Sequence, residues 1–405
     1  MSDQQNRMQD RMADMMEATR LTANGRLGDA SALIQRSLGD GKTNGMNEPQ
    51  GAVSHTAEAG LTDRLRKVVE TVTQGLGRSV APVLHGLGVQ GLGVQGLGGG
   101  AQEPGQRGLD VLGRQVMEPE SVRDEDRFVE RSFTGEHGTR DYKLFVPGSR
   151  ARNRPLVVML HGCSQSPDDF AAGTGMNALA EAHGFTVAYP GQSSRANGQR
   201  CWNWFQPGEQ DREAGETGII AGLTRAVIAE YGIDPRQVFI AGLSAGGAAA
   251  ANVAHAYPEL FAAVGIHSGL AAGCARDVSA ALTVMRLGPV AEADCIAPVT
   301  PMPTIVFHGE SDGTVNPRNG AQALAQAGIG GLTPETTEAV SAGGLPYLRT
   351  RYADTKGHVS VESWMVRGLG HAWSGGTIAG SYTDPRGPDA SRAMLNFFLA
   401  NPLKA

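Results

Sequence analysis

Short stretches made almost entirely of apolar residues recur between residues 156 and 307, and they constrain the fold more than any other feature of the sequence. A stretch of four or five such residues, bounded by turn residues, is typical of a strand that is buried on both faces. The chain contains five of them: Leu156–Leu160, Phe185–Tyr189, Val238–Ala241, Ala263–Ile266 and Thr304–Phe307. The candidate covering helices lie between these stretches, over Asp168–His183, Glu213–Tyr231 and Ala245–Tyr257. We therefore expect a parallel sheet with helices on both faces.

Further elements extend this sheet at both ends. Phe128–Phe133 and Asp141–Val146 alternate apolar and polar residues around a turn, which predicts an antiparallel hairpin at one edge. Ser360–Val366 and Asp389–Leu399 predict a last strand and a last helix. The expected fold class is therefore α/β, with a doubly wound, mostly parallel sheet and an antiparallel N-terminal edge hairpin.

The first 118 residues differ in composition from the remainder. Residues 1–75 contain segments with apolar residues at helical spacing, whereas residues 76–118 repeat Gly-Leu-Gly-Val-Gln before a run of glycines. Such glycine density predicts a flexible linker. We expect a helical segment over residues 1–75, a Gly-rich linker over residues 76–118 and one α/β domain over residues 119–405. Two interpretations of the helical segment stay open, namely a disordered leader and a small docking element.

Composition and charge exclude several classes of function. The 405 residues carry a net charge of -6, and no cluster of Lys and Arg is interleaved with aromatic residues, so nucleic acid is not an expected partner. The apolar stretches are too short to span a bilayer, and the charged first thirty residues do not fit a signal peptide. The four cysteines form no metal-binding pattern; they are Cys163, Cys201, Cys274 and Cys295. Their even number permits two disulfides, which favours a compartment outside the reducing cytosol and conflicts with the missing signal.

Gly242-Leu243-Ser244-Ala245-Gly246 lies between the strand Val238–Ala241 and an alanine-rich helix. This is the G-x-S-x-G pattern in the strand-turn-helix context that makes it a nucleophile elbow, a feature of the α/β-hydrolase fold. The glycines let the backbone turn sharply, and the helix N-terminus favours negative charge near the serine. Ser244 is therefore the predicted nucleophile.

A serine at neutral pH needs a general base and an acid that orients the base. In this fold class the acid follows a later strand and the histidine lies near the end of the chain. Asp312 comes soon after the strand Thr304–Phe307, and His371 follows the strand that ends at Val366. Taken alone, Asp312 also fits a turn aspartate and His371 an exposed loop histidine. Their order and context favour an acid and a base.

Glu310 is the main rival for the acid, because it lies two residues from Asp312 on the same loop. The other acidic candidates, Asp294 and Asp354, do not follow a predicted strand. The remaining histidines near predicted elements are less suitably placed as a base; they are His255, His267, His308 and His358.

Hydrolysis through a tetrahedral intermediate also needs N–H donors for the oxyanion. The backbone N–H of Ala245, next to the nucleophile, is the first candidate donor. His161-Gly162-Cys163 follows the strand Leu156–Leu160 at the position of the second donor, so the backbone N–H of Cys163 is the other candidate. We expect His161 to shape this loop and not to act as a base.

Several separate motifs in the same order resemble the esterase/polyhydroxybutyrate (PHB) depolymerase family. They cover about residues 125 to 400 and comprise Leu160-His161-Gly162-Cys163-Ser164-Gln165, the run Asp169–Met176, Cys201-Trp202-Asn203-Trp204-Phe205, Gly242–Gly247 and Gly370-His371-Ala372-Trp373. The resemblance implies an α/β-hydrolase that cleaves poly(3-hydroxybutyrate) or other short-chain polyhydroxyalkanoates, or their oligomers, without a metal or organic cofactor. It also implies an extracellular or periplasmic location.

Alternatives to a polyester substrate remain open. The family includes acetyl xylan and feruloyl esterases, and a non-catalytic granule-associated protein is the alternative outside enzymes. Many members carry a signal peptide and a C-terminal polymer-binding domain that this sequence does not show. We therefore expect attack on amorphous polymer, oligomers or small esters. The sequence predicts no oligomeric state.

The cysteines and tryptophans give the last predictions. We expect Cys163 to pair with Cys201 and Cys274 with Cys295, with four buried thiols as the alternative. The expected substrate-binding residues are Trp373, two residues from the predicted base, and Trp202 and Trp204 on a loop after the strand Phe185–Tyr189. Ordinary core packing is the alternative for each tryptophan.

Overall fold

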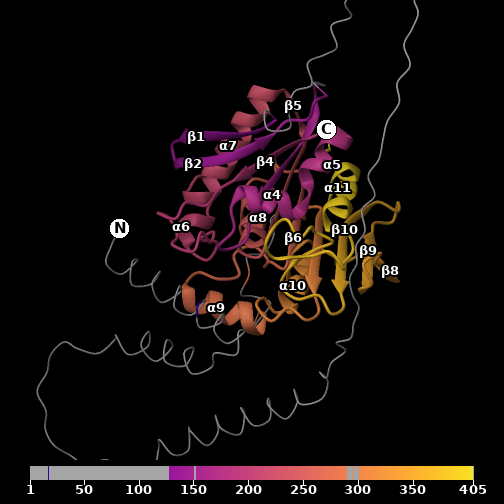
Figure 1. The fold of residues 1–405 in the computed structure, drawn as a ribbon. Helices are drawn as coiled ribbons and strands as arrows, with labels where there is room; N and C mark the ends of the chain where they lie inside the picture. Colours follow the sequence, from indigo (N-terminus) through magenta and orange to yellow (C-terminus); the bar gives the residue numbers. More distant parts are fainter. Residues whose placement is uncertain (1–16, 18–126, 150–151, 290–294, 296–300, 405) are drawn as a thin grey trace, which may run out of the picture. The chain divides into compact units, whose positions relative to one another are not determined.

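The computed structural model describes residues 17, 127–149, 152–289, 295 and 301–404 (Figure 1). The predicted helical segment and Gly-rich linker lie outside the described residues, apart from Glu17. The division of the chain at residues 75 and 118 therefore stays a prediction.

A ten-stranded sheet forms the centre of the described part, with the strand order β1-β2-β4-β3-β5-β6-β7-β10-β9-β8. The strands are β1 (Phe128–Gly135), β2 (Gly138–Phe145), β3 (Arg154–Leu160), β4 (Thr186–Pro190), β5 (Ile233–Leu243), β6 (Ala263–His267), β7 (Thr304–Gly309), β8 (Thr333–Val340), β9 (Pro346–Ala353) and β10 (Val359–Val366). From β4 to β10 the neighbours are parallel, whereas β1, β2, β8 and β9 pair antiparallel. The predicted mostly parallel sheet with an antiparallel N-terminal hairpin is confirmed, and a second antiparallel hairpin, β8–β9, extends the other edge.

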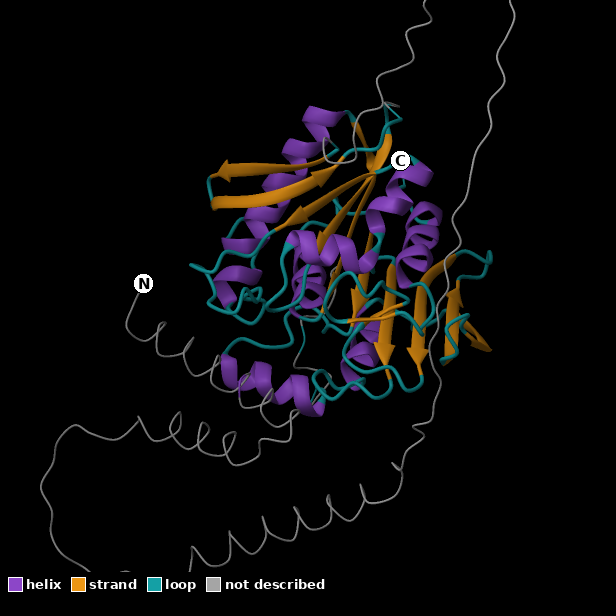
Figure 2. Ribbon diagram, in the orientation of Figure 1, coloured by secondary structure: helices purple, strands orange, loops and turns teal. Residues whose placement is uncertain are grey.

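Burial explains why the apolar stretches are so uniform. Every residue of β4, β6 and β7 is buried, as expected for strands covered on both faces. Helices lie on the two sides of the sheet (Figure 2). They are α4 (Pro167–Thr174), α5 (Met176–His183), α6 (Pro207–Gln210), α7 (Gly215–Tyr231), α8 (Ala245–Ala256), α9 (Val278–Leu287), α10 (Arg318–Gln326) and α11 (Ala390–Ala400).

Two cores result, one on each face of the sheet. Residues of α7 and α8 pack in the first core, and residues of α4, α5 and α11 pack in the second. The long helix predicted over Asp168–His183 is broken in two, because Gly175 adopts φ +64° between α4 and α5. Among the described residues, no helix combines the length and apolar character needed to cross a membrane.

The parallel strands bring the candidate residues to one edge of the sheet. β3 ends just before His161, β5 just before Ser244, and β7 three residues before Asp312. β10 ends five residues before His371. Because the carboxyl ends of parallel strands meet at the same edge, these loops lie together, which is where α/β folds place their active sites.

Candidate active site

Ser244 occupies a sharp turn between β5 and α8. Its backbone has φ +57° and ψ -121°, a conformation that costs an L-residue about 1–3 kcal/mol and is found mainly at functional sites. The turn is possible because Gly242 and Gly246 lack side chains: a Cβ on Gly242 would meet the backbone of Gly246, and one on Gly246 would meet the Leu160 carbonyl. The elbow thus packs directly against the end of β3.

Asp312 and His371 are directly hydrogen-bonded. The Nδ1–H of His371 donates to Oδ2 of Asp312 at 2.8 Å, while Oδ1 of Asp312 accepts from the backbone N–H groups of Thr314 and Val315 at 2.9 Å each. Burial alone would raise the pKa of Asp312, but the hydrogen bond and charge of His371, with the Val315 N–H, hold it below its usual value. An ionised Asp312 then fixes the histidine tautomer in which Nε2 can accept a proton.

Close backbone packing brings these two loops together. A Cβ on Gly309, the last residue of β7, would meet the carbonyl oxygens of Leu369 and Gly370, immediately before His371. The N–H of Ser311 also donates to the Leu369 carbonyl at 3.0 Å. Glycine at position 309 is therefore required if the loop that carries Asp312 (the acid loop) is to approach the loop that carries His371 (the histidine loop).

His267 links the nucleophile to the histidine loop, which the sequence analysis did not anticipate. Its carbonyl accepts from the Ser244 N–H at 2.9 Å, and its Nε2 accepts from the Ser374 N–H at 2.9 Å. The ring stacks on Trp373, with 4.9 Å between ring centroids. Burial keeps its pKa well below the usual value, so the neutral ring acts as a structural acceptor. In the described residues no hydrogen bond joins the Ser244 hydroxyl to His371, a contact that often tightens only when substrate binds.

The rival residues have other partners or surroundings. Glu310 has an exposed side chain, whereas the Asp312 carboxylate is fully buried. The Nε2–H of His308 donates to the Val315 carbonyl at 2.9 Å, so this histidine supports the acid loop. Asp354 accepts from the backbone of its own turn, and His358 is exposed there. Asp294 lies outside the described residues.

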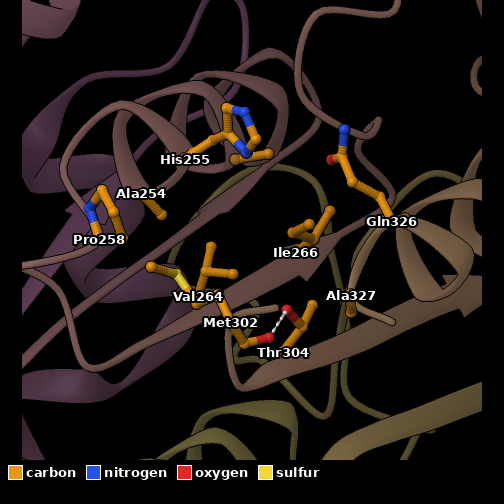
Figure 3. Close-up of a pocket in the computed structure, with 11 residues that line it drawn as sticks. Ala254, His255, Pro258, Val264, Ile266, Met302, Thr304, Gln326 and Ala327 are labelled. Atoms are coloured by element: carbon orange, nitrogen blue, oxygen red, sulfur yellow. Dashed lines mark hydrogen bonds between the residues drawn. The ribbon is translucent and has the colours of Figure 1, made fainter. Parts of the chain in front are cut away.

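His255 lines a small cavity away from these loops. The cavity of about 50 Å³ lies between α8, β6, β7 and α10 (Figure 3). Apart from His255, Gln326 and Thr304, its walls are apolar, and Thr304 donates its hydroxyl to the Met302 carbonyl there. It contains none of the residues predicted for catalysis.

The loop after β3 is held by internal hydrogen bonds. His161 donates from Nδ1 to the Gly162 carbonyl at 2.7 Å and accepts at Nε2 from the Gln192 N–H at 3.0 Å. Burial lowers its pKa to about 4, so the ring is neutral, as a residue that shapes the loop should be. The Gly162 N–H is also used, since it donates to Oε1 of Gln165 at 2.8 Å.

The two predicted oxyanion donors follow neighbouring strands. Leu160 and Gly242 are paired across β3 and β5, and Cys163 and Ala245 each lie three residues beyond that pair. Within the described part of the chain, neither of these two N–H groups donates a hydrogen bond to another protein group. Both therefore stay available to a substrate oxygen.

Both predicted disulfides are present, Cys163–Cys201 and Cys274–Cys295. The first joins the loop after β3 to the loop that contains Trp202. The indole N–H of Trp202 reinforces this connection by donating to the His161 carbonyl at 3.0 Å.

The three tryptophans predicted to contact substrate lie in the core of the described residues. Trp202 and Trp204 are buried, and Trp373 is only 1% exposed. The Trp373 indole donates to the Ser391 hydroxyl at 3.0 Å and packs edge-on against Phe170. Core packing, the alternative interpretation, accounts for the burial of all three rings, and the indole N–H groups of Trp202 and Trp373 have partners inside the protein.

The loop between β11 (Trp373–Ser374) and β12 (Thr383–Asp384) carries exposed apolar groups. Tyr382 is 48% exposed, and its hydroxyl lies 3.3 Å from that of Ser164, next to Cys163. Ile378 on the same loop is 88% exposed. No motif marks these residues in the sequence. In the described residues, no group of three or more His, Cys, Asp or Glu is placed to hold a metal ion.

Residues 140–344, half of the chain, match the sequence model of the family described as esterase PHB depolymerase. The chain belongs to this family. It is 36% identical over 239 residues to poly(3-hydroxyalkanoate) depolymerase C of Paucimonas lemoignei, covering 56% of this chain and 56% of that protein. The chain thus spans about half the length of this depolymerase relative.

Other members of the family are named for a different substrate. The chain is 29% identical over 248 residues to a probable acetylxylan esterase A of Aspergillus niger, covering 56% of this chain and 79% of that protein. The solved structure of an acetyl xylan esterase from Aspergillus awamori superimposes with a TM-score of 0.53 at 23% identity, over 67% of this chain and 99% of that one. This likeness and the sheet order show the α/β-hydrolase fold.

Proposed function

We propose that this chain is a serine ester hydrolase in which Ser244 is the nucleophile, His371 the general base and Asp312 the acid that orients it. The observation that carries the proposal is the 2.8 Å hydrogen bond from His371 to the buried carboxylate of Asp312, at the sheet edge where the strained elbow presents Ser244. Membership of a family whose relatives are named as depolymerases and esterases supports the same reaction class.

The geometry supports a two-step acyl transfer. Ser244 Oγ attacks the ester carbonyl carbon, and its proton passes to Nε2 of His371. The carbonyl oxygen becomes an oxyanion that accepts from the N–H groups of Cys163 and Ala245. When the intermediate collapses, the ester C–O bond breaks, and the His371 proton goes to the departing alkoxide. A water molecule then repeats the sequence on the acyl-enzyme and releases the acid, which restores Ser244.

We propose poly(3-hydroxybutyrate) or a related short-chain polyester, or its oligomers, as the substrate. The identity of 36% to a poly(3-hydroxyalkanoate) depolymerase supports this choice over the acetyl esters named for the relative that is 29% identical. The exposed ring of Tyr382, whose hydroxyl lies beside Ser164, offers apolar contact to methyl and ester groups. Acetylated xylan is the second candidate because that relative is matched over 79% of its length.

A panel of esters tests both levels of the proposal. The purified chain is assayed with p-nitrophenyl butyrate, 3-hydroxybutyrate oligomers, acetylated xylan and a feruloyl ester, beside Ser244→Ala. We expect activity on the oligomers and the small ester, and its loss in Ser244→Ala with an unchanged circular dichroism spectrum. A preference for acetylated xylan would replace the polyester. No turnover of any ester would favour the non-catalytic, granule-associated alternative.

A further inference from the structure

A buried polar cluster lies beside the loop after β3, which carries the predicted oxyanion donor Cys163. Its members are Arg140 on β2, Gln192 after β4, Asn203 on the disulfide-linked loop and Glu216 on α7, each at most 5% exposed. Arg140 donates to Oε1 of Gln192, and Nε2 of Gln192 donates to Oε1 of Glu216. The charged ends of the cluster are therefore bridged by an amide and do not pair directly.

Glu216 is the acceptor on which two segments converge. Its Oε2 accepts from the backbone N–H of Asn203 at 2.8 Å, and its Oε1 accepts from the Asn203 side-chain amide at 2.9 Å as well as from Gln192. Three donors thus share one carboxylate. A glutamine could not replace it without turning an N–H₂ group toward one of these donors.

Both segments lead to the predicted oxyanion donor Cys163. On one side, the backbone N–H of Gln192 holds His161, two residues before Cys163, and the Gln192 side chain also donates to the Cys201 carbonyl at 3.0 Å. On the other side, Asn203 lies two residues after Cys201, which is disulfide-bonded to Cys163. Glu216 therefore holds both segments that are connected to the loop after β3, namely the segment at Gln192, which bonds His161, and the segment at Asn203, which is close to the Cys163–Cys201 disulfide.

The charge of Glu216 is costly for the fold, which argues that it serves a purpose beyond packing. Burial, together with the nearby Glu209, raises the pKa of Glu216 to about 7, although Arg140 and the donors from Gln192 and Asn203 favour the ionised form. Buried ion pairs are often no more stabilising than apolar side chains of the same shape. What a carboxylate supplies, and an apolar residue does not, is a rigid acceptor for several donors at once.

We propose that Glu216 is a positioning residue of the oxyanion hole: by holding Gln192 and Asn203, it sets the direction of the Cys163 N–H toward the substrate oxygen. This assignment rests on the proposed ester hydrolysis. Loss of the carboxylate leaves three donors without a shared acceptor, and the loop shifts away from the transition state. Because a misplacement of about 1 Å can lower a rate roughly 10²-fold, the effect appears in kcat.

Glu216→Gln is the principal variant, and Glu213→Gln is its matched control. Glu213 lies three residues away with an exposed side chain whose nearest ionic contact, to Arg212, is 3.9 Å long. With p-nitrophenyl butyrate, we expect Glu216→Gln to lower kcat roughly 10- to 100-fold with KM within about twofold, and Glu213→Gln to match the wild type. A trifluoromethyl ketone, which forms an oxyanion adduct with Ser244, should bind more weakly to Glu216→Gln by a similar factor.

Two further measurements separate positioning from a general loss of structure. Gln192→Met removes the side-chain amide that bonds Glu216 and the Cys201 carbonyl, and it keeps the backbone N–H that holds His161. It leaves Glu216 and Asn203 in place, so it should lower kcat similarly, and combining it with Glu216→Gln should add little. This variant also serves as the test if Glu216→Gln does not fold. Wild-type kcat and ketone affinity in both folded variants would overturn the assignment. Absence of ester hydrolysis by the wild type would instead reject the proposed function, and the assignment with it.

Discussion

Asp312→Asn tests the proposed acid most sharply, because the structure determines which way the new amide must turn. Oδ1 of Asp312 accepts from the backbone N–H groups of Thr314 and Val315, whereas Oδ2 accepts from His371. In asparagine, the carbonyl oxygen must face the two backbone donors, since an N–H₂ group there would leave them unsatisfied. The amide nitrogen then points at Nδ1 of His371 and donates to it.

This reversal changes the tautomer of the base. Nδ1 must now accept, so the histidine proton moves to Nε2, and Nε2 loses the lone pair that should take the Ser244 proton. The imidazolium formed during the reaction also loses its anionic partner. The equivalent change in a well-studied serine hydrolase lowers kcat by roughly 10⁴-fold, and we expect a similar loss here, which corresponds to about 5 kcal/mol of transition-state stabilisation.

The assay compares kcat for p-nitrophenyl butyrate in Asp312→Asn and Glu310→Gln. Glu310 is a matched control because it lies on the same loop with an exposed side chain. We expect Glu310→Gln to keep nearly full activity. Our reasoning is refuted if Asp312→Asn retains more than a few per cent of the wild-type kcat while folded. If Glu310→Gln lost the activity that Asp312→Asn kept, Glu310 would be the acid instead.

Two further predictions concern substrate binding and pH. Tyr382→Ala should weaken binding of 3-hydroxybutyrate oligomers by about 1–2 kcal/mol, which raises KM for the oligomers by the corresponding factor, and it should leave p-nitrophenyl acetate turnover almost unchanged. Equal effects on both substrates would contradict a contact between Tyr382 and the polymer. Because folding raises the pKa of Glu216 to about 7 from an ordinary value near 4.5, this group makes wild-type stability fall as pH rises through that window. Glu216→Gln lacks this decline, so urea unfolding should show its stability relative to wild type increasing by on the order of 3 kcal/mol between pH 4.5 and 7.5, and a difference independent of pH would refute it. His161, whose pKa of about 4 acts in the opposite direction, is present in both proteins and cancels.

The central sheet could be predicted because the composition of each strand depends directly on whether its two faces are buried. A strand covered on both faces must be apolar throughout, and β4, β6 and β7 are buried at every position. The exposed β8 carries no such signal: its sequence Thr-Pro-Glu-Thr-Thr-Glu-Ala-Val is almost wholly solvent-facing. Proline and glutamate are typical of a protected edge strand but are not typical of strands in general.

The roles of side chains that depend on neighbours from distant parts of the chain were harder to predict from the sequence. Trp373 follows the predicted base by two residues, yet its ring turns inward onto His267, over a hundred residues away in the chain. Glu216 shows the same difficulty, since its partners Gln192 and Asn203 come from other elements and no spacing pattern relates them. Proximity in sequence to a catalytic residue therefore predicted the place of a side chain and not its direction.

The histidines show how structure selects among residues that sequence order alone only ranks. His161, His267 and His308 all lie at or near the ends of the strands that carry the candidate site, so strand position alone does not separate them from His371. Each is almost completely buried, and burial lowers its pKa, so all three are neutral rings used as donors or acceptors to the backbone. A base must instead meet both an orienting carboxylate and the substrate. His371 has that combination, because its side chain is 13% exposed and its Nδ1 is bonded to a carboxylate that is fully buried. Burial of the acid with partial exposure of its histidine partner is therefore what distinguishes the proposed base from its structural neighbours.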